Sequence, residues 1–268
     1  MILLLFFLAA LAAGVCACFA GLVLWQAALV WLGAFVGLNL LFAVFWAVVS
    51  FTVDDTKPLE RARPICIHGC GAIAGWLCSW ARVRVELGGT ELLPEGRFLL
   101  VCNHLSMFDP IVTEYALRGY ELAFISKAAN FKIPFYARLS YGAGFLPINR
   151  ENDREALKTI LFAADYLKKD FCSMVVYPEG TRSKTGELGP FHAGSFKIAQ
   201  RANVPVVVAS VRGTPLVGRN FPFRSTRVRL QILGCIPAGQ VKAMNTQELS
   251  ALCREQIAQD QQPAEAAV

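Results

Sequence analysis

His104 and Asp109 are separated by four residues, in a polar segment that follows an apolar run at 98–102 and precedes a helix-like segment starting at Pro110. The residue before a proline avoids the helical region, so Asp109 is predicted to lie outside that helix as its cap. A loop of this length can fold back and bring the carboxylate to the imidazole. The pair would then act as a general base, because the acid would fix the tautomer of the ring and the second ring nitrogen could take a proton from a hydroxyl. A plain helix cap is the alternative interpretation of the same spacing.

Two more polar segments follow apolar runs that are predicted to be strands. The run at 144–148 leads into Arg150, and the run at 173–177 leads into the polar turn 178–183, which contains a carboxylate, a glycine, a hydroxyl and a guanidinium. Guanidinium groups bind phosphates through paired hydrogen bonds. A surface arginine and an ordinary turn are the alternatives. Because α/β folds place their sites at strand ends, we expect these segments to meet His104 at one edge of a sheet.

The elements that must position these residues alternate along the chain from residue 83. Strands are predicted at 83–87, 98–102, 122–125, 144–148, 173–177, 204–211 and 228–233, and helices at 110–118, 131–140, 153–169, 194–202 and 246–258. This alternation indicates a single α/β domain at 83–258, with a central, mostly parallel or mixed sheet flanked by helices. The tail 259–268 is predicted to be disordered.

The first part of the chain carries no charge before Asp54. Hydrophobic residues make up 55% of the whole chain and charged residues only 17%, which is too apolar for an ordinary soluble domain. As one helix, this part would be far longer than the ~30 Å hydrocarbon core of a bilayer. The sequence therefore predicts a membrane anchor at 1–53 that forms a helical hairpin of two transmembrane helices, at 2–24 and 28–51. One span plus an interfacial helix is the alternative.

A polar linker and an interfacial helix are predicted at 54–82. Lys57, Arg61 and Arg63 follow the second predicted span, so the positive-inside rule places this side of the membrane in the cytoplasm. The apolar segment 65–81 is short and rich in glycine, which favours a helix on the membrane or on the domain over a third span. The net charge of +6 suits an anionic surface or substrate. No basic tract with interleaved aromatic residues indicates a nucleic-acid groove.

The nine cysteines include no Cys-x-x-Cys pair. They are typical of small hydrophobic residues in a reducing compartment, and not of a disulfide framework or a zinc site. Cys102 lies two residues before His104 and is a conceivable nucleophile. Strand alternation favours packing instead, because it points the Cys102 side chain away from the side of the histidine.

Four ordered blocks of the chain resemble those of the glycerolipid acyltransferases, in particular the bacterial 1-acyl-sn-glycerol-3-phosphate acyltransferases. The blocks are Asn103-His104-x4-Asp109, Gly144-Phe145-Leu146-x-Ile148-x-Arg150, Pro178-Glu179-Gly180-Thr181-Arg182-Ser183 and Val204-Pro205-Val206. The resemblance covers about 83–215 and includes a lysine, Lys127. Two places depart from the pattern of the family: the Lys-x-Glu that is frequent near this lysine reads Lys127-Ala128-Ala129-Asn130 here, and His192 stands where a lysine is common. These departures leave the acceptor preference open.

The resemblance implies an integral enzyme of the cell membrane, with its catalytic domain on the cytoplasmic face and membrane lipid beside the site. It would move an acyl group from an acyl-carrier protein or acyl-coenzyme A to the free hydroxyl of lysophosphatidic acid (1-acylglycerol 3-phosphate), giving phosphatidic acid in phospholipid biosynthesis. The catalytic residues would be His104 and Asp109, and the substrate-binding residues Arg150, Glu179, Gly180, Thr181, Arg182 and Lys127. The arginines and the lysine would bind phosphate, and the other three would shape the glycerol site. The family needs no metal or tightly bound cofactor.

Three alternatives remain open at this point. The same chemistry could act on glycerol 3-phosphate or on another lysophospholipid. A metal-dependent hydrolase could be built on His104, Asp109 and Glu179, although the sequence offers few further ligands. A catalytically inactive membrane scaffold is disfavoured, because His104, Asp109 and both arginines are present.

Overall fold

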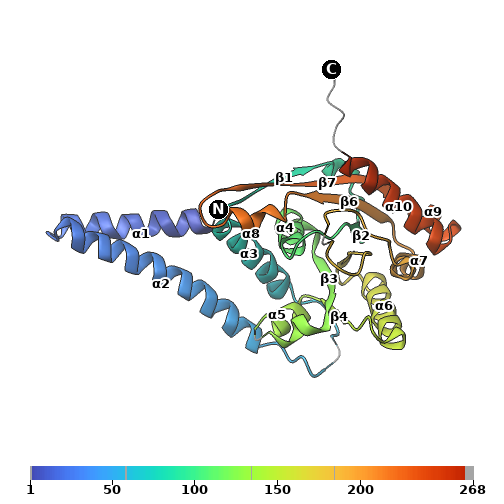
Figure 1. Ribbon diagram of the computed structural model, residues 1–268. Coiled ribbons are helices and arrows are strands. Elements are labelled where there is room, and N and C mark those ends of the chain that lie inside the picture. The colour runs from blue at the N-terminus through green and yellow to red at the C-terminus, as the bar shows by residue number, and fades with distance from the viewer. Residues whose placement is uncertain (1, 58, 134, 184, 263–268) are drawn as a thin grey trace, which may run out of the picture.

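A seven-stranded sheet forms the centre of the molecule in the computed structural model, which describes residues 2–57, 59–133, 135–183 and 185–262 (Figure 1). The strand order is β1-β7-β6-β2-β5-β3-β4. The strands are β1 (Val83–Gly88), β2 (Leu99–Cys102), β3 (Leu122–Lys127), β4 (Leu146–Ile148), β5 (Ser173–Val176), β6 (Val206–Arg212) and β7 (Thr226–Ile236). Strands β6, β2, β5, β3 and β4 are parallel, whereas β7 is antiparallel to β6 and β1 is parallel to β7. The prediction of one α/β domain with a mixed sheet is confirmed.

Two groups of helices pack around this sheet (Figure 1). One group is α3 (Pro64–Trp80), α4 (Phe108–Ala116) and α5 (Tyr136–Gly142), and the other is α6 (Asp153–Lys168), α7 (Lys197–Ala202) and α10 (Thr246–Gln261). Between them the helices cover the central strands, and every residue of β2 and β5 is buried. Two further helices, α8 (Leu216–Asn220) and α9 (Ala238–Ala243), escaped prediction because helices this short show no clear periodicity.

Several boundaries differ from the prediction by a few residues, and two of them concern the site loop and the C-terminal tail. Helix α4 already includes Asp109, and its N-cap is Met107, so the prediction that Asp109 lies outside the helix was wrong. Hydrogen bonds from two loop N–H groups to the Asp109 carboxylate hold it in the first turn and outweigh the extended preference of a residue before proline. Helix α10 continues to Gln261, so the predicted tail begins later than residue 259. Its last part, 263–268, lies outside the described residues.

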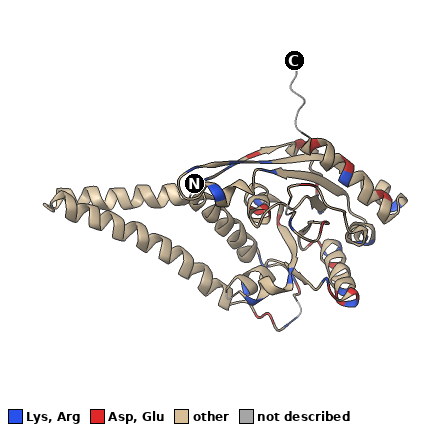
Figure 2. Cartoon of the chain, in the orientation of Figure 1, with Lys and Arg blue, Asp and Glu red and all other residues tan. Residues whose placement is uncertain are grey.

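The apolar N-terminal part forms a helical hairpin of α1 (Ile2–Phe19) and α2 (Leu24–Phe51), which projects from the domain (Figure 1). Both helices are long and apolar enough to cross a membrane, and Figure 2 shows no charged residue on either. The turn lies at 20–23, within the first of the two spans that were predicted at 2–24 and 28–51. Gly21 takes a positive φ of 88° there, a conformation that glycine adopts readily.

Helix α3 lies on the domain, between the hairpin and α4. The indole nitrogens of Trp76 and Trp80 both donate hydrogen bonds to the side-chain oxygen of Asn39 in α2, at 2.8 and 3.3 Å. A Cβ on Gly69 would clash with the ring of Trp46, so this glycine allows the two helices to approach closely. Of the two locations that the sequence left open for this segment, the structure shows packing on the domain.

Candidate active site

The loop after β2 is held in place at its first two residues. The side-chain amide of Asn103 donates to the carbonyl of Val211 at the end of β6, and the N–H of Val211 donates back to the Asn103 oxygen, at 3.0 and 2.8 Å. The backbone N–H of His104 donates to Glu179 Oε1 at 2.6 Å, and its carbonyl accepts from the N–H of Ser183 at 2.8 Å. The loops after β2, β5 and β6 are therefore joined around His104.

His104 and Asp109 are in direct contact. The Nδ1 atom of His104 lies 2.8 Å from Asp109 Oδ2, and Asp109 is fully buried. The same oxygen accepts hydrogen bonds from the backbone N–H groups of Leu105 and Ser106, and the second oxygen accepts from the hydroxyl of Thr214. Because an ionised carboxylate can only accept, Nδ1 carries the proton and Nε2 presents a lone pair. This is the arrangement that a general base requires.

The His104 ring also stacks on the ring of Tyr177, with 4.6 Å between the ring centroids. Burial raises the pKa of the Tyr177 hydroxyl well above its ordinary value, and this hydroxyl donates to the side chain of Thr113. Sequence reasoning missed the roles of Tyr177 and Thr214. Both follow the carboxyl end of a strand, β5 or β6, and that position was the signal that could have identified them.

Glu179 holds the backbone of two loops. Its Oε1 atom binds the N–H of His104 and its Oε2 atom binds the N–H of Gly189 at 2.9 Å, and the residue is buried. The geometry therefore gives it a positioning role, where the sequence suggested that it shapes a substrate site. The adjacent Gly180 has a positive φ of 75°, and a Cβ there would lie 3.0 Å from the ring of His192. This glycine is needed for both its conformation and its close contact.

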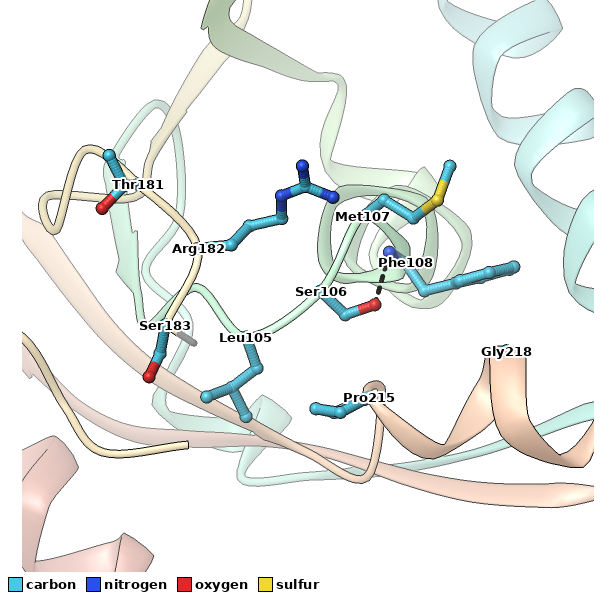
Figure 3. Close-up of a pocket in the computed structure, with 9 residues that line it drawn as sticks. All are labelled: Leu105, Ser106, Met107, Phe108, Thr181, Arg182, Ser183, Pro215 and Gly218. Carbon is cyan, nitrogen blue, oxygen red and sulfur yellow. Dashed lines mark hydrogen bonds between the residues drawn. The ribbon is translucent and has the colours of Figure 1, made fainter. Parts of the chain in front are cut away.

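The two arginines border this arrangement at different places. Arg150 lies against Gly180, with its Cδ atom 3.9 Å from where a Cβ would be. Arg182 lines a pocket of about 570 Å³ (Figure 3). The other lining residues are Leu105, Ser106, Met107, Phe108, Thr181, Ser183, Pro215 and Gly218. Within the described parts of the chain neither arginine forms an ion pair, so both can bind an anion.

Two other predicted segments lie further from His104. Lys127 is the exposed last residue of β3, at the same edge of the sheet. The block Val204-Pro205-Val206 lies at the start of β6, where the carbonyl of Pro205 accepts from the N–H of Leu99. It is therefore at the opposite edge of the sheet from the site. The other end of the same strand supplies Thr214.

Two alternative chemistries do not fit the donor groups. Cys102 is buried, and burial raises the pKa of its thiol well above the ordinary value, which disfavours a thiolate nucleophile. Both oxygens of Glu179 and those of Asp109 already accept hydrogen bonds from N–H or hydroxyl groups. In the described ranges no group of three His, Cys, Asp or Glu residues is placed to hold a metal ion. The metal-hydrolase alternative therefore lacks its ligands.

The sequence and the fold match known proteins. Residues 84–212 match the family model described as Acyltransferase, which spans the His104 loop, Arg150 and the 178–183 turn. Residues 84–212 therefore form an acyltransferase domain. It is 28% identical to a putative 1-acyl-sn-glycerol-3-phosphate acyltransferase of Caenorhabditis elegans, over 66% of this chain and 64% of the relative. It is 36% identical to a chloroplastic 1-acyl-sn-glycerol-3-phosphate acyltransferase of Brassica napus, over 50% and 41%.

A solved structure shares the architecture of this chain. It is the crystal structure of the 1-acyl-sn-glycerophosphate acyltransferase PlsC from Thermotoga maritima, with a TM-score of 0.64, 25% identity and coverage of 82% of this chain and 86% of that one. The chain spans less than two thirds of the length of the Caenorhabditis and Brassica relatives. Sequence and fold therefore agree on the family.

Proposed function

We propose that this chain transfers a fatty acyl group from an acyl thioester to the free hydroxyl of lysophosphatidic acid, giving phosphatidic acid. The observation that carries the proposal is the contact between His104 and the buried Asp109. His104 Nε2 takes the proton of the acceptor hydroxyl as the oxygen attacks the thioester carbonyl. The C–O bond forms, the C–S bond breaks, and the protonated imidazole returns a proton to the leaving thiolate.

The acceptor phosphate binds to guanidinium groups in this proposal. Arg150 and Arg182 have no acidic partner in the described ranges, and each offers paired donors that match a phosphate. Lys127 at the end of β3 is a third candidate cation. Gly180 and Thr181 lie between the two arginines in the chain and border the glycerol part of the acceptor. The second possibility is that the acceptor is glycerol 3-phosphate or a lysophospholipid with a larger headgroup. Comparing the rates of acylation of these acceptors decides between the possibilities.

The location of the enzyme is also part of the proposal. We infer that α1 and α2, within residues 1–53, anchor the chain in the membrane, and that the catalytic domain lies on the cytoplasmic face. The uncharged hairpin supports the anchor, and the basic residues Lys57, Arg61 and Arg63 after α2 support the orientation. The acyl donor in this proposal is an acyl-carrier protein or acyl-coenzyme A.

A product assay tests the reaction. The purified protein in detergent is offered lysophosphatidic acid, glycerol 3-phosphate and several lysophospholipids, each with acyl-carrier protein or coenzyme A thioesters, and products are identified by mass. We expect phosphatidic acid as the main product, and at least about 10²-fold slower formation of it by the variant His104→Ala. Faster acylation of a different acceptor would replace the proposed substrate while keeping the chemistry.

The arginines should act on the acceptor alone. A hydrogen bond to a charged group contributes about 1.5–3 kcal/mol, so Arg150→Ala or Arg182→Ala should raise the KM for lysophosphatidic acid about 10- to 150-fold. The KM for the acyl donor should stay nearly unchanged, as should both constants in a control variant, Arg201→Ala, on the exposed surface of α7. Equal changes for both substrates would show that the arginine supports the fold instead.

A further inference from the structure

The segment 216–224, which comprises α8 and the loop before β7, exposes large apolar side chains. Phe223 is 85% exposed, Phe221 is 50% exposed and Leu216 is 46% exposed. Burying such side chains is favourable, by roughly 25 cal/mol per Å² of apolar area removed from water, and nothing in the described chain covers them. They lie on a short helix and the loop that follows it, and their exposure leaves them free to insert into a partner.

This segment borders both the pocket and the apolar helices. At one end, Pro215 and Gly218 line the pocket that contains Arg182 (Figure 3). At the other end, the carbonyl of Pro222 accepts a hydrogen bond from Arg82, the second residue after α3. The last residue of α3, Trp80, contacts the middle of α2 through Asn39. The exposed phenylalanines therefore lie beside the part of the domain from which the hairpin projects (Figure 1).

The charge of the segment selects the kind of partner. Residues 213–230 include the arginines Arg219, Arg224, Arg227 and Arg229 and no acidic residue. The first two are exposed and flank the phenylalanines. Apolar side chains with adjacent basic ones are the pattern by which proteins bind the interface of a bilayer that contains anionic lipid.

We propose that segment 216–224 is a second membrane contact, in which Phe221 and Phe223 enter the headgroup–acyl boundary of an anionic bilayer and Arg219 and Arg224 bind its phosphates. The contact places the mouth of the pocket at the lipid surface, so that a lysolipid can reach the site without crossing water. The proposal rests on the membrane attachment proposed above, and it makes the domain, and not only the hairpin, a lipid-binding element.

Photo-crosslinking in vesicles tests the contact without requiring activity. The photoreactive residue p-benzoylphenylalanine replaces one side chain at a time in the full chain, reconstituted in vesicles of phosphatidylcholine and phosphatidylglycerol. The three positions are Phe223, the hairpin residue Leu41, which is 66% exposed, and Phe162 on α6, which is 57% exposed. Helix α6 lies on the other side of the domain from the hairpin (Figure 1). After irradiation, mass spectrometry measures the lipid adduct on each variant.

We expect lipid adducts at positions 41 and 223, each several-fold more abundant than at 162. An adduct at 41 without one at 223 would overturn the proposal and leave the anchor intact, and so would equal adducts at 223 and 162. Crosslinks from position 223 to protein would overturn it in favour of a protein partner. An adduct at 223 without one at 41 would support the contact and overturn the membrane hairpin.

The arginines provide an independent measurement. Contact with an anionic surface strengthens binding about fivefold for each nearby arginine. Arg219→Gln with Arg224→Gln should therefore lower the adduct at position 223 in anionic vesicles at low salt by at least this factor. The control pair, Arg201→Gln with Lys242→Gln, removes the same charge from exposed sites on α7 and α9 and should leave the adduct unchanged. Equal effects of the two pairs would overturn the headgroup role of the arginines.

Discussion

Helix α4 contains two buried carboxylates with opposite surroundings. Asp109, in its first turn, is 0% exposed and accepts hydrogen bonds from four groups, including the ring of His104. Glu114, further along the helix, is 5% exposed, and its Oε2 atom has no hydrogen-bond partner among the described residues. Burial raises the pKa of Glu114 to about 8. The surroundings of Asp109 stabilise a negative charge, whereas those of Glu114 favour the protonated form.

The comparison shows that burial alone does not make a carboxylate functional. Asp109 faces the loops after β2 and β6, where backbone N–H groups and a hydroxyl converge at the carboxyl edge of the sheet. Glu114 faces α3, where its Oε1 atom lies 3.7 Å from where a Cβ of Gly71 would be, and this glycine has no side chain to offer a hydrogen bond. The same helix therefore holds the partner of His104 at one end and a carboxyl group with a raised pKa further along.

The largest effect on kcat is expected from substitution of His104, whose ring Asp109 orients. A positioned general base supplies about 10²–10⁴-fold in rate, so His104→Ala should lower kcat by that factor while expression and membrane insertion remain normal. Steady-state kinetics of phosphatidic acid formation measures this change. A variant with nearly full turnover would show that another group acts as the base.

The two carboxylates should respond differently to amide substitution. Asp109→Asn turns an amide N–H₂ toward groups that all donate, so it should lower kcat about 10²-fold, the lower end of what a positioned base supplies. Glu114→Gln should keep kcat close to the wild-type value at pH 7. Both are measured by kinetics beside thermal unfolding. If the loss in Asp109→Asn were explained wholly by a lower melting temperature, Asp109 would stabilise the loop at 104–106 and would be no part of the base.

The pH dependence of stability should identify Glu114. The folded state keeps its proton up to about pH 8, whereas the unfolded chain loses it near the ordinary value of 4.5. The contribution of Glu114 to the free energy of unfolding is therefore fully present below pH 4.5 and is lost as the pH rises to about 8, at about 1.4 kcal/mol per pH unit.

Glu114→Gln should remove this slope. The difference in free energy of unfolding between wild type and variant should change steadily from pH 5 to pH 8, as measured by chemical denaturation in detergent. Glu91→Gln alters an exposed carboxylate and should run parallel to the wild type. Parallel curves for Glu114→Gln as well would mean that its carboxyl is solvated in the folded protein.

The smallest decrease in kcat is expected when Thr214, one of the four donors to Asp109, is replaced. Thr214→Val removes its hydroxyl hydrogen bond, which is worth about 1.5–3 kcal/mol, while three donors remain. We expect kcat to fall about tenfold and Thr214→Ser to restore it, because serine keeps the hydroxyl. A valine variant with full activity would show that the other three donors are sufficient.

Local patterns in the sequence were enough to predict the class of fold and most of its elements. The positions of all seven strands were predicted to within a few residues. Continuous apolar runs indicated strands that are buried on both faces, such as β2 and β5, because two-sided burial requires apolar side chains throughout. Alternation of apolar and polar residues indicated β1. The uncharged N-terminal part predicted two helices, because it is too long for a single helix across the hydrocarbon core of a bilayer. His104 and Asp109 could be paired because a short loop limits how far apart the two side chains can be.

Only the tertiary structure decided which residues complete the site. Thr214 reaches Asp109 across more than a hundred residues, and Tyr177 stacks on His104 because β5 and β2 are neighbours in the sheet. Glu179 holds the His104 backbone because its carboxylate accepts hydrogen bonds from two loops, through the N–H groups of His104 and Gly189. The sequence shows which side chains exist and how they alternate, but the order of strands sets which loop ends converge. That order depends on packing between distant segments, which no local pattern contains.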